Sequence, residues 1–196
     1  MPPSRPNFIV GIGGSAGGLN AYKALIGALP SDTGMAFVII SHMMPNSQSQ
    51  LAEILARHTK MPVRGVSEAM PVQANSVYVL FPNADVLVEG DNFKVVSPRT
   101  ARNKQVDIFL MSLAANMGAR AIGVILSGYD GDGTEGCELI KAKGGITFAQ
   151  DFSAEVGNMP LSAQIAGCID FVLSPEGIAR ELVRIAAVPL NPPNRK

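Results

Sequence analysis

The chain has 196 residues, of which 47% are hydrophobic, so it is long and apolar enough for one buried core and is most economically a single domain. Its 16 basic and 16 acidic residues cancel, and this balance excludes the cationic excess that nucleic-acid binders use against phosphates. No apolar run approaches the roughly 18 residues of a membrane span, and the N-terminal MPPSRPNF lacks the apolar segment of a secretion signal. We therefore expect a soluble, cytoplasmic protein.

Short apolar, β-branched runs alternate along the chain with stretches of helical periodicity. The predicted strands are Phe8 to Ile12, Ala36 to Ile40, Ser76 to Leu80, Ala121 to Leu126, Ile146 to Ala149 and Ile169 to Leu173. The predicted helices are Leu19 to Leu29, Gln48 to Arg57, Val106 to Met117, Thr134 to Lys143, Pro160 to Ala166 and Pro175 to Ile185. This alternation predicts an α/β fold, a doubly wound, mainly parallel sheet with helices on both faces.

The section from Val77 to Val96 departs from this rhythm. Its short segments VYVLF, DVLVE and NFKVVS are separated by turn residues, a pattern that predicts a small β-hairpin insertion. The domain is expected to cover residues 8–188, with flexible tails at 1–7 and 189–196. Cys137 and Cys168 lack metal-ligand spacing, and we expect reduced, buried thiols rather than a disulfide.

The first predicted strand runs into a glycine-rich turn, FIVGIGGSAGG, that fits two unrelated motifs. Gly11-x-Gly13-x-x-Ala16 matches the dinucleotide-binding fingerprint, in which glycines let the backbone approach a pyrophosphate. Gly13-x-Ser15-x-Gly17 matches the nucleophile elbow, in which a sharp strand-to-helix turn presents a serine hydroxyl. Either motif alone is weak, since such a turn can also serve only tight packing.

The two motifs make different demands on the rest of the chain. A dinucleotide site needs an acid at the end of the second strand, but Asp32 precedes that strand, which ends in Ser41-His42. Ser15 and His42 follow the first two strands, so both are expected at the carboxyl edge of the sheet, where an imidazole can accept the serine proton. Asp130 and Asp132 follow a later strand, and spacing alone leaves both as the orienting acid.

His58 and the segment DGDGTE are two further candidates for functional residues. His58 stands at a predicted helix end, where it most simply caps carbonyls or faces solvent. DGDGTE resembles part of a calcium loop, but its ligand pattern stops short of the full motif, so no metal is expected.

The segments GIGGSAGG, SHMMPN, VILSGYDGDGTEG, GGITFAQD and NMPLSA occur in this order and spacing. Together they resemble the catalytic domain of the CheB-type protein-glutamate methylesterases of chemotaxis receptors, over about Phe8 to Ile185. The resemblance implies a serine hydrolase that removes methyl groups from γ-glutamyl methyl esters on receptor helices and releases methanol, with deamidation of receptor glutamines as a second activity. No cofactor is expected.

The resemblance also implies roles for single residues. By motif, Ser15 is the nucleophile, His42 the general base and acid, and Asp132, rather than Asp130, the orienting acid. The backbone N–H groups of Ala16 and Tyr129 would form the oxyanion hole.

Four residues depart from the family pattern. Tyr129 stands where Met or Thr is usual and Asp130 where Gly is usual, while Asn158 and Leu161 replace a common Gly and Arg. A second carboxylate beside His42 is expected to raise its pKa and to move the alkaline side of the pH–activity profile. Leu161 removes a possible contact to an acidic receptor surface.

The expected partners are methylated receptor helices, together with a receptor methyltransferase or a regulatory receiver domain in the same or another chain. We expect no receiver domain within this sequence. The cations Arg99, Arg102 and Lys104 form either a solvated loop or a surface that attracts acidic helices. The alternative function is a catalytically silent docking module of the same fold.

Overall fold

The computed structural model describes residues 4–42 and 50–188. Its strands are β1 (Ile9–Gly14), β2 (Ala36–Ser41), β3 (Val63–Gly65), β4 (Ser76–Val79), β5 (Asp85–Glu89), β6 (Asn92–Val96), β7 (Ala121–Ile125), β8 (Ile146–Gln150) and β9 (Phe171–Leu173). Its helices are α1 (Gly18–Gly27), α2 (Leu51–Ala56), α3 (Gln105–Met117), α4 (Thr134–Ala142), α5 (Asn158–Ile165) and α6 (Pro175–Ala186), with a short 3-10 turn at Gly118–Arg120.

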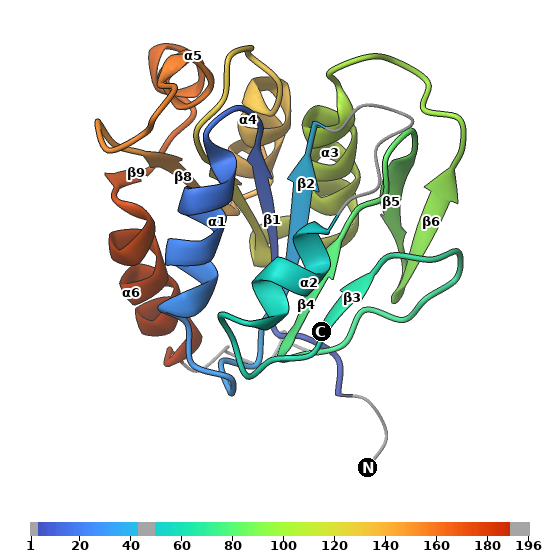
Figure 1. Ribbon diagram of the computed structural model, residues 1–196. Helices are drawn as coiled ribbons and strands as arrows, with labels where there is room; N and C mark the ends of the chain where they lie inside the picture. The colour runs from blue at the N-terminus through green and yellow to red at the C-terminus, as the bar shows by residue number, and fades with distance from the viewer. Residues whose placement is uncertain (1–3, 43–49, 189–196) are drawn as a thin grey trace, which may run out of the picture.

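Seven of these strands form one sheet in the order β3-β4-β2-β1-β7-β8-β9, and every neighbouring pair in it is parallel (Figure 1). The chain winds outward from β1 on one side and then returns to continue from β7 on the other side. The winding therefore reverses beside β1, and in open parallel sheets the crevice at the carboxyl ends of the strands forms at such a point.

The sheet is covered by helices on both faces, which confirms the predicted doubly wound α/β fold (Figure 1). Apolar side chains of α1, α2 and α6 pack on one face, around Phe37 and Ile39 of β2. Those of α3, α4 and α5 pack on the other, with Val38 and Ile40 of the same strand. Alternate residues of a strand point to opposite faces, so a strand covered on both sides must be apolar throughout.

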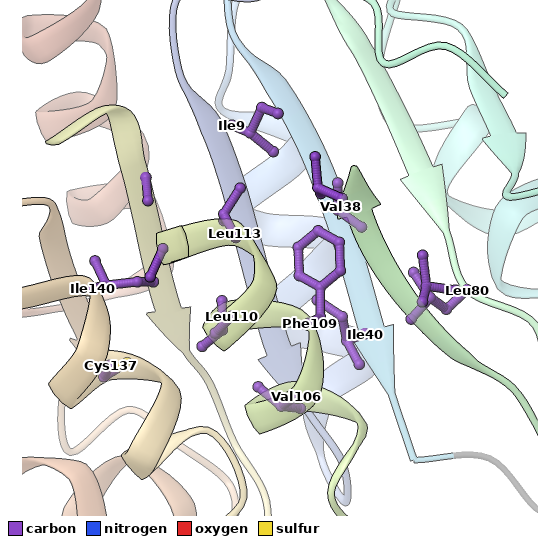
Figure 2. Close-up of a cluster of buried hydrophobic side chains, with 14 of the residues drawn as sticks. Ile9, Val38, Ile40, Leu80, Val106, Phe109, Leu110, Leu113, Cys137 and Ile140 are labelled. Carbon is purple, nitrogen blue, oxygen red and sulfur yellow. The ribbon is translucent and has the colours of Figure 1, made fainter. Parts of the chain in front are cut away.

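Helix α3 lies across the centre of its face. Figure 2 shows Val106, Phe109, Leu110 and Leu113 on this helix, close to side chains of β1 and β2. These positions are fully buried, and their spacing of three and four residues is that of one helix face. The N-terminal end of α3 is thereby fixed at the carboxyl edge of β1.

The predicted hairpin is confirmed as the antiparallel pair β5–β6, whose apolar side chains join the core on the α3 face (Figure 1). The sequence did not predict β3, a short edge strand. The predicted helix from Gln48 begins in residues outside the described part, and α2 is described from Leu51.

The predicted tails fall partly outside the described residues, which exclude 1–3 and 189–196. Within the first tail, the carbonyl of Ser4 accepts a hydrogen bond from Ala74 N, and Asn7 N donates one to the carbonyl of Gly34. Both cysteines are free and buried. None of the helices in the described ranges is long and apolar enough to cross a bilayer.

Candidate active site

Ser15 occupies the sharp turn between β1 and α1. Its backbone N–H donates to the carbonyl of Ser127 at 2.8 Å, and its carbonyl accepts from Gly18 N at 2.9 Å. Gly17 has φ +72°, a left-handed conformation that a side chain would disfavour. The turn therefore holds a half-buried serine at the carboxyl end of a buried strand, as the nucleophile-elbow motif predicts.

The neighbouring glycines of β1 make room for side chains of the protein itself. A Cβ built on Gly13 would lie 2.4 Å from Cγ1 of Val106 in α3, and one built on Gly14 would lie 2.6 Å from the Tyr22 hydroxyl. The space that a dinucleotide fingerprint leaves for a pyrophosphate is thus filled by helix side chains, so these glycines serve packing.

His42 follows β2, next to the strand that carries Ser15. Gly14 and Ser41 are paired in the parallel register of the two strands, and Ser15 and His42 are the next residue of each. Because neighbouring strands lie about 4.8 Å apart, the two residues start from adjacent positions at one edge of the sheet.

Asp132 reaches His42 from the loop after β7. His42 Nε2 and Asp132 Oδ2 are 2.6 Å apart, and the carboxylate of Asp132 is fully buried. The other ring nitrogen, Nδ1, lies 3.4 Å from Asp130 Oδ2 and is buried without a hydrogen-bond partner in the described part of the chain. Both aspartates that the sequence left open therefore face this imidazole, on its two different nitrogens.

The pKa of His42 is raised above its ordinary value of about 6.5. Burial is the largest single influence and acts to lower the pKa. The hydrogen bond to Asp132 and the charges of Asp130 and Asp132 together outweigh it, and the charge of Arg99 lowers the pKa again by a smaller amount. Arg99 thus lies within electrostatic reach of the site.

A buried serine that the sequence did not single out, Ser127, ties the Ser15 turn to two loops. Its hydroxyl donates to the carbonyl of Ala16 at 2.7 Å and accepts from Val156 N at 2.9 Å. Its own N–H donates to Gln150 Oε1 at 3.0 Å. The sequence signal that could have identified Ser127 is its position in VILSG, two residues beyond the end of β7.

The backbone N–H groups of Ala16 and Tyr129 belong to the two turns that meet at Ser15. The N–H groups of Ser15 and Gly128 donate to the carbonyls of Ser127 and Val156, whereas those of Ala16 and Tyr129 make no hydrogen bond among the residues described. Gly128 separates Ser127 from Tyr129, and a Cβ built on it would lie 3.2 Å from Ser15 Cβ. Free donors close to a serine can stabilise an oxyanion.

Asp32 and His58 lie apart from this cluster, whereas α5, which carries Asn158 and Leu161, adjoins it through the hydrogen bond from Met159 N to the Gly128 carbonyl at 2.9 Å. Asp32 and His58 line an open cavity of about 570 Å³ with Arg57 and Lys60, at the end of α1 and before β2, the opposite edge of the sheet. Asn158 begins α5, and Leu161 of the same helix is 52% exposed. Within residues 4–42 and 50–188, no three His, Cys, Asp or Glu side chains are arranged to hold a metal ion.

The family model for the CheB methylesterase matches residues 10–182. The chain belongs to the CheB methylesterase family. The crystal structure of the CheB methylesterase catalytic domain of Thermotoga maritima superposes with a TM-score of 0.83 at 26% identity, over 91% of this chain and 98% of that one. This match confirms the fold expected for a CheB domain.

Two further CheB relatives are similar in sequence. A Leptospira interrogans protein with the provisional name protein-glutamate methylesterase/protein-glutamine glutaminase is 33% identical over 178 residues, which are 89% of this chain and 92% of its own length. The protein-glutamate methylesterase/protein-glutamine glutaminase 3 of Burkholderia orbicola is 33% identical over 183 residues, 91% of this chain and 54% of its own length.

Proposed function

We propose that this chain is a serine hydrolase that cleaves γ-glutamyl methyl esters on the helices of chemoreceptor-type proteins, with Ser15, His42 and Asp132 as its catalytic triad. The family and the names of its relatives support the reaction. The observation that carries the triad is the 2.6 Å contact of Asp132 with His42 Nε2, while Nδ1 has no hydrogen-bond partner among the residues described.

The contact with Asp132 assigns each ring nitrogen a task. In the neutral imidazole, Nε2 carries the proton and its N–H donates a hydrogen bond to Asp132, so Nδ1 holds the lone pair. As Ser15 Oγ attacks the ester carbonyl carbon, its proton passes to Nδ1. Asp132 then stabilises the imidazolium that forms.

The remaining steps follow from the same groups. The carbonyl oxygen becomes an oxyanion that accepts hydrogen bonds from the N–H groups of Ala16 and Tyr129, and each such donor contributes about 3 kcal/mol when it is already aimed. The Nδ1 proton moves to the methoxy oxygen, and methanol leaves an acyl group on Ser15. Water then attacks this ester, gives its proton to Nδ1, and Ser15 regains a proton as the glutamate carboxylate is released.

The same steps convert a glutamine side chain to glutamate, with ammonia leaving instead of methanol. The relatives' second name, protein-glutamine glutaminase, supports deamidation as a further activity of this site. Both reactions pass through the same acyl group on Ser15, so they are expected to be lost together.

Methanol release from methyl-labelled receptor tests the proposal. Ser15→Ala is expected to lower the rate at least a thousandfold, whereas Ser31→Ala, which removes an exposed hydroxyl at the opposite edge of the sheet, is expected to leave it unchanged. No methanol from the wild-type chain, with receptor binding retained, would instead identify a silent docking module. Equal rates for wild type and Ser15→Ala contradict the triad.

A further inference from the structure

Helices α3 and α4 both begin without a cap of their own. The residue before α3 is Lys104 and the residue before α4 is Gly133, and neither supplies a side-chain hydrogen bond to its helix. The first turn of a helix exposes backbone N–H groups that have no partner within the helix. In a buried helix end these groups need an acceptor from elsewhere.

Each helix receives that acceptor from a carboxylate attached to the other. Asp132, just before α4, accepts from Val106 N at 3.0 Å and from Asp107 N at 2.8 Å in the first turn of α3. Asp107, in that first turn, accepts from Gly133 N and Gly136 N, both at 2.9 Å, at the start of α4. The two aspartates therefore form a reciprocal cap between the helices.

The reciprocal cap holds Asp132 Oδ2, the atom that contacts His42, in place. The Oδ2 atom of Asp132 that accepts from Val106 N is the same atom that lies 2.6 Å from His42 Nε2. The backbone that carries Asp132 is held through the next residue, Gly133, by Asp107. A shift of α4 relative to α3 would therefore move the carboxylate away from the imidazole.

We propose that Asp107 is a positioning residue of the esterase, which acts through Gly133 and Asp132 to hold His42 in its reactive orientation. The inference rests on the proposed function of the site. Asp107 touches neither Ser15 nor His42 in the described structure, so it does not take part in the chemistry itself.

The charges around the pair fit this role. Two buried carboxylates side by side repel each other, and burial together with the charge of Asp132 raises the pKa of Asp107 above its ordinary value. Gly136 N–H and Lys104, whose Nζ lies 3.1 Å from Asp107 Oδ2, partly offset this rise. Lys104 also pairs with the exposed Glu135 at 3.2 Å, and the positive ends of both helix dipoles face the carboxylates.

Histidine titration by NMR reads the position of Asp132 without any substrate. The chain has two histidines, and His58 lies at the opposite edge of the sheet. The charged groups acting on His42 are Asp130 and Asp132, from the loop after β7, and Arg99, from the loop after β6. If Asp132 moves away, the pKa of His42 falls.

Three variants separate positioning from charge and from stability. Asp107→Ala removes the acceptor and is expected to lower kcat about ten- to a hundredfold with KM within twofold, and to lower the His42 pKa. Asp107→Asn keeps an oxygen for Gly133 N and Gly136 N without the charge and is expected to stay within about threefold of wild type. Ser174→Ala removes the cap that Gly177 N uses on α6; it should destabilise the protein but change neither kcat nor the His42 pKa.

The inference is overturned if Asp107→Ala keeps the wild-type kcat and His42 pKa, or if Asp107→Asn loses as much as Asp107→Ala, since charge alone would then explain the loss. Where the alanine variant does not fold, Asp107→Glu takes its place, because the longer side chain displaces the acceptor while keeping the charge. Failure of the proposed function would be seen differently, as no release of methanol by the wild-type protein. In that case the pKa of His42 in the variants still tests whether Asp107 positions Asp132.

Discussion

The carboxylate of Asp130 lies 3.4 Å from Nδ1 of His42, the ring nitrogen that has no hydrogen-bond partner in the described structure. One Asp130 oxygen accepts from Asp132 N at 3.2 Å while the other faces the ring, so the side chain is held toward the imidazole. The same nitrogen must take the proton of Ser15 in the proposed reaction. Asp130 therefore stabilises the protonated, inactive form of the base.

Replacing Asp130 by Asn is expected to lower the pKa of His42, because one of the charges that raise it is removed. The neutral imidazole is the active form, so the ascending acid limb of kcat/KM against pH should move to lower pH. This replaces the expectation from the sequence that the alkaline side of the profile would move, because the imidazole loses its proton along the ascending limb. Initial rates of methanol release between about pH 5 and pH 9 measure it.

Asp32→Asn is the matched control, since this exposed carboxylate lies at the opposite edge of the sheet. Its profile is expected to overlay that of the wild type. An unchanged acid limb in the Asp130 variant would show that Asp130 does not act on the base.

The raised pKa of His42 also makes the stability of the fold depend on pH. A group that binds its proton more tightly when folded stabilises the folded state fully below its unfolded pKa, about 6.5. This stabilisation is lost as the pH rises through the folded value.

Chemical denaturation of wild type and His42→Gln at about pH 5.5 and pH 8.5 measures this contribution. The wild type is expected to lose more stability than the variant between the lower and the higher pH. An equal change in both proteins would mean that the histidine binds its proton no more tightly in the folded state.

Most of the fold was predictable because a sheet covered on both faces needs continuously apolar strands. The runs that predicted β1, β2, β7 and β8 are of this kind, and their bounds agree within about two residues. Strand β3 is different, since its three residues lie at the sheet edge and are only partly buried. Such a strand leaves no apolar run in the sequence.

The candidate site was predictable where chemistry follows a strand and was missed where it depends on contacts between distant segments. Ser15, His42 and Asp132 each stand after a strand that the apolar pattern identified. Asp107 lies within a helix, and the N–H groups it accepts belong to residues 26 and 29 positions further along the chain. Capping signals in a sequence are local, and the residues before α3 and α4, Lys104 and Gly133, gave none.

Arg99 acts on His42 with the opposite sign to Asp130. Its charge lowers the pKa of the imidazole, so Arg99→Gln is expected to raise that pKa and to move the acid limb of kcat/KM to higher pH. No ion pair in the described structure engages this guanidinium, and an acidic receptor helix would meet it at the rim of the site. The variant should therefore also raise KM about two- to fivefold at low salt, and less at high salt.

Lys60→Gln serves as the control for Arg99, because it removes an exposed cation at the opposite edge of the sheet. It is expected to leave both the pH profile and KM unchanged. A KM that rises equally in the two variants would indicate a general effect of net charge on receptor binding rather than a contact at the site.

Substitution of Gly13 tests whether the glycine-rich turn needs glycine for packing against α3. A Cβ at this position would lie 2.4 Å from Val106 Cγ1, and Val106 is fully buried at the start of α3. Because α3 cannot move away without losing its contacts with the sheet, Gly13→Ala is expected to lower the free energy of unfolding by about 1 to 3 kcal/mol. The same shift would move Val106 N, which holds Asp132, so the esterase rate should fall as well.

Gly157→Ala is the matched substitution, since a Cβ built there meets nothing within 4 Å. Its free energy of unfolding is expected to stay within about 0.5 kcal/mol of the wild-type value. If Gly13→Ala behaves in the same way, the close approach of α3 to β1 does not constrain this residue. The glycine would then have to be explained by something other than packing, and a ligand that approaches the backbone would again be a candidate.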